Sequence, residues 1–90
     1  MRVARRFIIR GRVHGVGFRV FTEDVARREG IHGWVRNLPD GSVEAAAEGD
    51  SEALERFERA VRHGPPAARV DSVDVEDDVP TIRDTGFMIR

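Results

Sequence analysis

The chain has 90 residues, a formal net charge of −1, 40% apolar and 34% charged residues, and no cysteine. This length suits one domain with a modest core, here residues 1–90. The composition excludes a disulfide framework, thiolate catalysis and cysteine-ligated zinc, and the balanced charge argues against a general nucleic-acid binder. No apolar run approaches the length of a membrane span or a signal-peptide core, so we expect a cytoplasmic protein with no membrane contact.

The first half of the chain predicts a strand, a helix and a β-hairpin. Residues 3–13 alternate between apolar and mostly basic side chains, which is typical of a half-buried strand. From Arg19 the apolar spacing changes to that of one helix face, and a glycine marks the helix end. Residues 31–38 return to a strand pattern. The turn at 39–41 then leads into a third strand that begins near Val43.

The third strand alternates small apolar residues with Glu44 and Glu48, so we expect it to have one buried face and one wet face. The sheet of an RNA-recognition module would expose two or three aromatic side chains on its central strands. The wet positions of the first and third strands carry charges instead, at Arg10, Arg12, Glu44 and Glu48. We therefore expect no nucleic-acid partner.

The second half of the chain predicts a helix and two further strands. Asp50 or Ser51 caps the helix, which ends at the Gly-Pro-Pro segment 64–66. Three pairs with glutamate four residues before arginine are expected on its outer face: Glu52–Arg56, Glu55–Arg59 and Glu58–Arg62. Residues 69–77 have a strand pattern, and residues 86–90 allow a short additional strand.

This order of elements predicts an α+β fold of the ferredoxin-like βαββαβ type. We expect one mostly antiparallel sheet with two helices on one face and a short C-terminal extra strand. A right-handed crossover makes the first two strands parallel, and the third usually lies between them. The loop at residues 14–19 and the end of the second strand, at Arg36 and Asn37, then lie on the same rim of the sheet.

The segment GRVHGVGFR, residues 11–19, places three glycines between a strand and a helix. A Walker-type loop needs a lysine, but all 15 basic residues are arginines, and a dinucleotide fingerprint needs a glycine where the chain has Val20. Gly15 and Gly17 allow main-chain N–H groups at the helix start to converge on one anion. Arg19 adds a planar guanidinium that can hold two phosphate oxygens. These residues predict a phosphate or carboxylate ligand, with a tight turn and a surface arginine as the alternative.

Four segments are in register with one another: GRVHGVGFR at 11–19, GWVRN at 33–37, DGSVE at 40–44 and EG at 48–49. With these segments the chain resembles the acylphosphatase family. The spacing is nearly unbroken from about residue 5 to 64. The resemblance implies an α/β sandwich that hydrolyses the carboxyl–phosphate bond of acyl phosphates, giving a carboxylate and inorganic phosphate.

The resemblance also implies roles for particular residues. It makes Arg19 the catalytic ligand of the phosphate and Asn37 the residue that positions the attacking water. The substrate-binding loop comprises His14, Gly15, Val16, Gly17, Phe18 and Arg19. The family usually has glutamine where this chain has His14, and we expect the imidazole to brace the loop. If it reached the phosphate, it would add a group that titrates near neutral pH.

An acyl phosphate is already activated, so the protein needs only to hold the dianion, neutralise developing charge and orient one water. No cofactor and no metal are expected, because His14, His32 and His63 lack ligand spacing and the carboxylates are scattered. We expect a small-molecule acyl phosphate as the partner, inorganic phosphate as product and inhibitor, and a monomeric protein.

Two other functions are consistent with the sequence. One is an acylphosphatase-like module that handles carbamoyl phosphate, as found at the start of hydrogenase-maturation carbamoyltransferases, which are long chains with cysteine-rich zinc segments. The other is an anion-sensing or interaction domain that has kept the loop and lost turnover, which an activity assay distinguishes. No residue pattern predicts a pocket for the acyl group.

Overall fold

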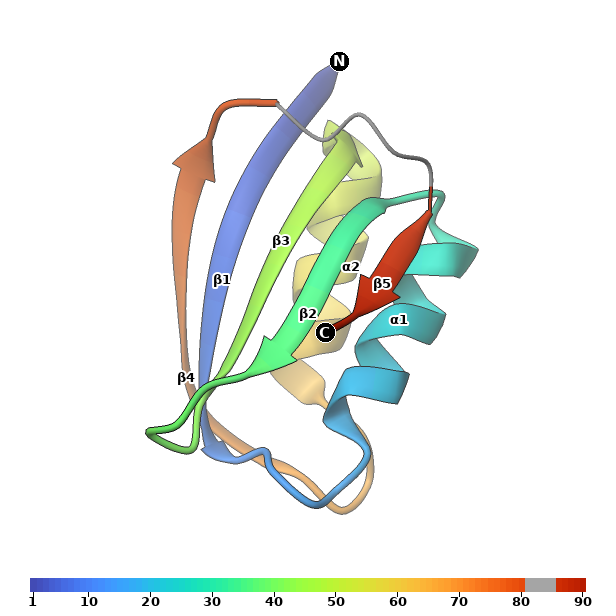
Figure 1. Cartoon of the computed structure of the whole chain (residues 1–90). Coiled ribbons are helices and arrows are strands. Elements are labelled where there is room, and N and C mark those ends of the chain that lie inside the picture. The colour runs from blue at the N-terminus through green and yellow to red at the C-terminus, as the bar shows by residue number, and fades with distance from the viewer. Residues whose placement is uncertain (81–85) are drawn as a thin grey trace.

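One sheet carries both helices on the same face, as Figure 1 shows for this computed structural model. The structure describes residues 1–80 and 86–90. Its elements in chain order are β1 (Arg2–Arg12), α1 (Phe18–Arg28), β2 (His32–Asn37), β3 (Val43–Asp50), α2 (Ser51–His63), β4 (Arg69–Asp78) and β5 (Phe87–Ile89). The predicted helices and strands are therefore all present, including the short strand near the C-terminus.

The strand order in the sheet is β4-β1-β3-β2-β5. β1 pairs antiparallel with β3 and β4, and β2 pairs antiparallel with β3. β5 pairs parallel with the far edge of β2. The predicted ferredoxin-like α+β fold is confirmed, with β3 inserted between the parallel strands β1 and β2. This topology brings the ends of β1 and β2 to the same edge of the sheet.

The core lies between the sheet and the two helices. Phe7 and Ile9 of β1 are fully buried there, and so is Phe57 of α2. The rings of Phe7 and Phe57 meet edge to face with 5.4 Å between their centroids. Each such side chain contributes about 1.5–3 kcal/mol through the apolar surface it removes from water. This packing fixes the position of the helices against the strands.

Asp50 is the residue that caps α2. Its carboxylate accepts the main-chain N–H of Glu52 at 3.2 Å and an N–H of the Met1 ammonium at 3.0 Å. The hydrogen bond from the ammonium, followed by that from Glu52, holds the pKa of Asp50 below its usual range. Ser51, the other predicted cap, is the first residue inside the helix.

Of the three predicted ion pairs on α2, one is present, one is replaced, and Glu55–Arg59 is not among the ion pairs formed within residues 1–80 and 86–90. Arg62 Nε lies 3.0 Å from Glu58 Oε2, as the spacing predicts. Arg56 instead binds Glu29, which follows α1, with 2.7 Å between Nε and Oε1, and this pair raises the pKa of Arg56 above its usual value. The prediction of a Glu52–Arg56 pair is wrong, because the packing of α1 beside α2 offers Arg56 a closer carboxylate.

The helix-free face of β3 is covered by side chains from its neighbours. Glu44 is 7% exposed and Glu48 is 2% exposed, so the predicted wet face of this strand is wrong. Arg2 Nε lies 2.7 Å from Glu48 Oε2, and Arg36 Nε lies 2.7 Å from Glu44 Oε1. The reason is topological: β3 is the central strand, and arginines of β1 and β2 are long enough to reach across it and neutralise its glutamates.

Trp34 of β2 also covers this face. The guanidinium carbons of Arg6, Arg36 and Arg90 lie 5.7, 5.2 and 4.4 Å from the centre of its ring. These distances are in the range of cation–π attraction. Neither helix in the described part of the chain is long and apolar enough to cross a membrane.

Candidate active site

The loop between β1 and α1 passes twice through the left-handed region of backbone conformation. The φ angles of Gly15 and Gly17 are 70° and 77°. A Cβ built at either position would meet no atom within 4 Å, so the backbone conformation and not lack of space favours glycine here. The loop reaches α1 at Gly17, which is its N-cap residue.

The N-terminus of α1 has no side-chain cap among the described residues. Gly17 has no side chain to offer, and the first turn contains no acidic residue. The N-terminus of α2, in contrast, is satisfied by Asp50. The first N–H groups of a helix lack partners within it and carry a partial positive charge. The start of α1 is therefore suited to an anion that is not part of the chain.

A cavity of about 130 Å³ opens at this helix start. Its lining residues come from the loop, the first turn of α1 and the end of β2: Val13, Gly15, Gly17, Phe18, Arg19, Val20 and Asn37. Figure 1 shows the loop and the end of β2 at the same end of the sheet, as predicted. His14 and Val16 belong to the loop, but they are not among the residues that line this cavity.

Arg19 is held from outside the loop. Its Nη1 donates to the main-chain oxygen of Arg90 at 3.1 Å, and the main-chain N–H of Arg90 donates to the oxygen of Val35 in β2 at 2.9 Å. None of the ion pairs formed within residues 1–80 and 86–90 includes Arg19. Its remaining N–H donors are thus available to an anion in the cavity.

Asn37 is the last residue of β2 and is paired in register with Val43 of β3. Its side chain is exposed at the cavity, and it forms no hydrogen bond with the rest of the described chain. A carboxamide carries both an acceptor oxygen and a donor NH₂ group. Asn37 can therefore accept from a water and donate to an oxygen of a ligand at the same time.

Phe18 anchors the loop in the core. Its side chain is 2% exposed, and its ring lies 6.1 Å from that of Phe21 with the planes at 60°. Because the ring points into the core, only the main chain of Phe18 is available to a ligand. The anchor also fixes the direction in which Arg19 leaves the helix.

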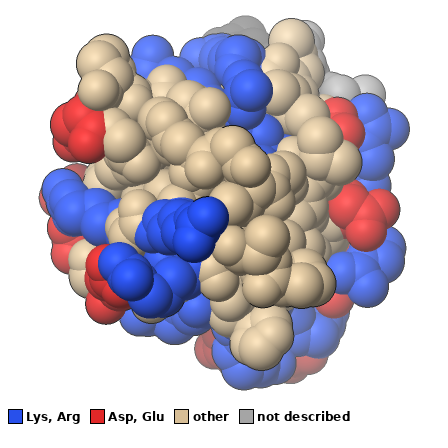
Figure 2. All heavy atoms as spheres, turned by 90° about the horizontal axis from the view of Figure 1, so that it is seen from below, with Lys and Arg blue, Asp and Glu red and all other residues tan. Residues whose placement is uncertain are grey.

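The loop end of the molecule is free of negative charge at its centre. Figure 2 looks at this end from below and shows broad uncharged surface with arginines over and around it. The carboxylates in this view lie toward the margin. An approaching anion therefore meets neutral or positive surface before it reaches the cavity.

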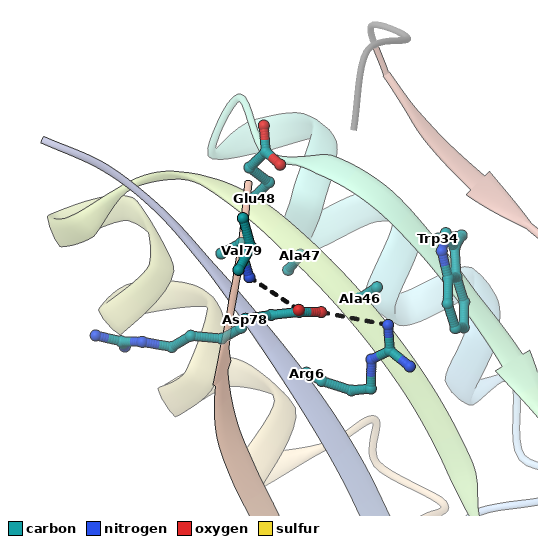
Figure 3. Close-up of a pocket in the computed structure, with 9 residues that line it drawn as sticks. Arg6, Trp34, Ala46, Ala47, Glu48, Asp78 and Val79 are labelled. Carbon is teal, nitrogen blue, oxygen red and sulfur yellow. Dashed lines mark hydrogen bonds and ion pairs between the residues drawn. The ribbon is translucent and has the colours of Figure 1, made fainter. Parts of the chain in front are cut away.

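A second hollow, of about 60 Å³, lies on the helix-free face and contains none of the predicted site residues (Figure 3). Arg6 Nη2 lies 3.2 Å from Asp78 Oδ2 there, and Asp78 also accepts the N–H of Val79 at 2.8 Å. Glu48 adds a second carboxylate to the lining. Arg5 and Arg6 also line the hollow, but each is already paired with a carboxylate, so this hollow is not a candidate for phosphate.

The structure adds two residues that sequence reasoning missed. Val20 lines the cavity although it is 62% exposed. Its signal in the sequence is an apolar residue on the outer side of a helix that is otherwise charged there. Arg90 supports Arg19 through its main-chain oxygen, and no sequence pattern indicates a contact made by a main-chain atom so far along the chain.

Comparison with known proteins identifies the family of the chain. The family model described as Acylphosphatase matches residues 5–89. A relative called acylphosphatase from Anaeromyxobacter dehalogenans is 55% identical over 75 residues, which are 83% of this chain and 81% of that protein. The crystal structure of acylphosphatase from Bacillus subtilis superposes with a TM-score of 0.94 at 39% identity and covers 98% of both chains.

A longer protein also contains a similar domain. The crystal structure of HypF from T. kodakarensis superposes with a TM-score of 0.85 at 31% identity, covering 98% of this chain but 12% of that one. The structures named acylphosphatase from Bacillus subtilis and Coxiella burnetii, in contrast, are matched over 98% and 93% of their own length. This chain belongs to the acylphosphatase family, and it is a hydrolase that acts on acyl phosphates.

Proposed function

We propose that the phosphoryl group of the acyl phosphate binds in the cavity at the start of α1. The main-chain N–H groups of the loop at Gly15–Arg19 and the guanidinium of Arg19 hold its oxygens. The observation that supports this most strongly is that Arg19 and Asn37, from separate parts of the chain, line one cavity together with an uncapped helix N-terminus. Inorganic phosphate, the product, has the same oxygens and acts as an inhibitor at this site.

In the proposed reaction, Asn37 accepts a hydrogen bond from a water and directs the oxygen of that water at phosphorus. The new phosphorus–oxygen bond forms as the bond to the acyl oxygen breaks, and that electron pair leaves with the carboxylate. The proton of the water passes to a phosphate oxygen, so no side-chain base is needed. Positioning and charge stabilisation account for most of the catalysis of phosphoryl transfer. Both are available from these residues.

Removal of the Arg19 guanidinium tests the assignment. Arg19→Ala is expected to lower kcat/KM for benzoyl phosphate by about 10³-fold or more, as for other arginines that stabilise a phosphoryl transition state. Inhibition by inorganic phosphate is lost in the same variant. Arg19→Lys is also expected to have a much lower kcat/KM, because an ammonium group cannot bind two phosphate oxygens with the fixed geometry of a guanidinium. Circular dichroism and urea unfolding are used to check that both variants fold.

Arg12→Ala is the matched control. It removes the same charge from the end of β1 next to the loop, and Arg12 does not line the cavity. We expect its kcat/KM to stay within about threefold of wild type, since a screened surface charge has a small effect. If Arg19→Ala keeps nearly normal turnover and phosphate inhibition, the phosphate does not bind here.

All residues of the proposed site come from one chain. We therefore propose that residues 1–90 form one domain that is active as a monomer. Sedimentation analysis at assay concentration checks this. An active species larger than one chain contradicts it.

A further inference from the structure

Val20 is the exposed apolar residue in the lining of the cavity. The other two large apolar side chains that line it belong to the core, with Val13 1% exposed and Phe18 2% exposed. Val20 is 62% exposed and follows Arg19 directly on the first turn of α1. The cavity thus has a polar wall, made by the loop, Arg19 and Asn37, and one apolar contact surface at its mouth.

The folding of α1 does not account for a valine at this position. The buried face of the helix is made by Phe18, Thr22, Val25 and Ala26, and its exposed positions otherwise carry charges, such as Asp24 and Arg27. Valine loses side-chain freedom in a helix and has a low helix propensity. Because Val20 neither packs in the core nor favours the helix, its apolar surface is available to a ligand.

We propose that Val20 forms the contact for the acyl group, and that the protein favours acyl phosphates whose acyl group is an apolar chain or ring. This inference rests on the proposed phosphate site. When Arg19 and the loop hold the phosphoryl oxygens, the acyl group of the bound substrate extends toward the mouth of the cavity. There it meets the exposed side chain of Val20.

The test compares substrates that differ only in the acyl group. We measure kcat/KM for benzoyl phosphate and for acetyl phosphate and take their ratio in wild type, Val20→Thr and Val20→Phe. Threonine keeps the shape of valine and replaces a methyl by a hydroxyl group. We expect the ratio to fall by about fourfold in Val20→Thr, which corresponds to the burial of one methyl or methylene group, and to rise in Val20→Phe.

Two further measurements separate this effect from general damage. The inhibition constant of inorganic phosphate stays constant across the Val20 variants, because phosphate has no acyl group. Val79→Thr is the matched control: Val79 is 69% exposed and does not line this cavity, so the ratio stays at the wild-type value. Circular dichroism verifies that each variant is folded.

The two proposals fail in different ways. An unchanged ratio in both Val20 variants overturns the acyl contact, even where Arg19→Ala abolishes turnover. An inhibition constant for phosphate that shifts as much as the substrate ratio also overturns it, because Val20 then acts on the phosphate site. Nearly normal turnover and phosphate inhibition in Arg19→Ala overturn the phosphate site and, with it, the acyl contact.

Discussion

His14 donates a hydrogen bond from Nε2 to the main-chain oxygen of Ser42, at 2.7 Å. The same oxygen accepts the main-chain N–H of Leu38 at 2.8 Å. Since a carbonyl oxygen only accepts, Nε2 carries the hydrogen. His14 precedes Gly15 and Leu38 follows Asn37, so a single carbonyl joins the loop between β1 and α1 to the end of β2 that carries the Asn37 amide. This contact supports the expectation that His14 braces the loop, which stays a prediction.

Replacement of His14 is expected to lower turnover because the loop and Asn37 lose their positions. His14→Ala removes the donor, and we predict a fall in kcat of about tenfold with a smaller change in KM, because the loop and Asn37 lose their shared anchor. His14→Gln restores most of the activity, since its amide NH₂ can donate to the same oxygen. Steady-state kinetics of the two variants checks this. Equal losses of kcat in His14→Ala and His14→Gln contradict a bracing role for His14.

The pH profile distinguishes a brace from a phosphate ligand. Nε2 carries a hydrogen both in an imidazolium and in the tautomer found here, so either form can donate to the Ser42 oxygen. We therefore expect wild type and His14→Gln to have parallel profiles of kcat against pH. A change of kcat with pH that occurs in wild type but not in His14→Gln shows instead that the imidazole contacts the substrate.

Asn37 is predicted to act on water more than on binding. Asn37→Ala should lower kcat by about 10²-fold, the range lost when one positioning group is removed. Inhibition by inorganic phosphate should stay near the wild-type value, because Arg19 and the loop remain. Asn37→Asp should be no better, because a carboxylate repels the phosphate dianion and lacks the donor. If Asn37→Ala keeps its kcat and loses phosphate affinity, the amide is instead a ligand of the anion.

Turnover is predicted to be independent of metal and of a covalent intermediate. Within residues 1–80 and 86–90, no three histidine or acidic side chains gather at one point, and the sequence has no cysteine. Dialysis against EDTA should leave kcat unchanged, and acid quench during turnover of acyl phosphate labelled with ³²P should trap no phosphoryl-protein. Loss of activity that a divalent cation restores contradicts independence of metal. A ³²P-labelled protein contradicts the absence of a covalent intermediate.

Asp40 is predicted to make the hairpin turn before β3 sensitive to acid. Its carboxylate accepts from the Ser42 hydroxyl and, at 2.9 Å, from the Ser42 N–H. These two hydrogen bonds hold the pKa of Asp40 below its usual value of about 3.8, and the bond from the hydroxyl has the larger effect. Because the folded form has the lower pKa, the stabilisation is complete above about pH 4 and is lost as the pH falls through the folded pKa.

Urea unfolding of wild type and Asp40→Asn checks this contribution. Wild type should be the more stable protein near pH 7, and the difference should narrow as the solution is acidified below about pH 4. An equal difference at neutral and acid pH shows that the charge of Asp40 plays no part in the turn.

The order and type of the elements followed from the sequence because each rests on local chemistry. The period-two alternation of 3–13, the helical spacing after Arg19 and the turn at 39–41 depend on residues that are neighbours in the chain. Arg19 was recognisable from the glycine loop before it, and Asn37 from the resemblance to the acylphosphatase family, while the known handedness of the crossover placed the two on one rim. Local patterns and one topological rule were enough for the fold, and the resemblance was needed for Asn37.

The tertiary structure alone decided the contacts between side chains from different elements. Glu44 and Glu48 looked exposed by their alternation, yet they are buried because arginines of the flanking strands reach over β3. Arg56 pairs with Glu29, which follows α1, and not with its predicted partner Glu52 on α2. The anchoring of His14 on Ser42 and of Arg19 on Arg90 involves main-chain oxygens, which every residue carries. A residue's identity therefore gives no signal for such a partner, and only the folded chain selects it.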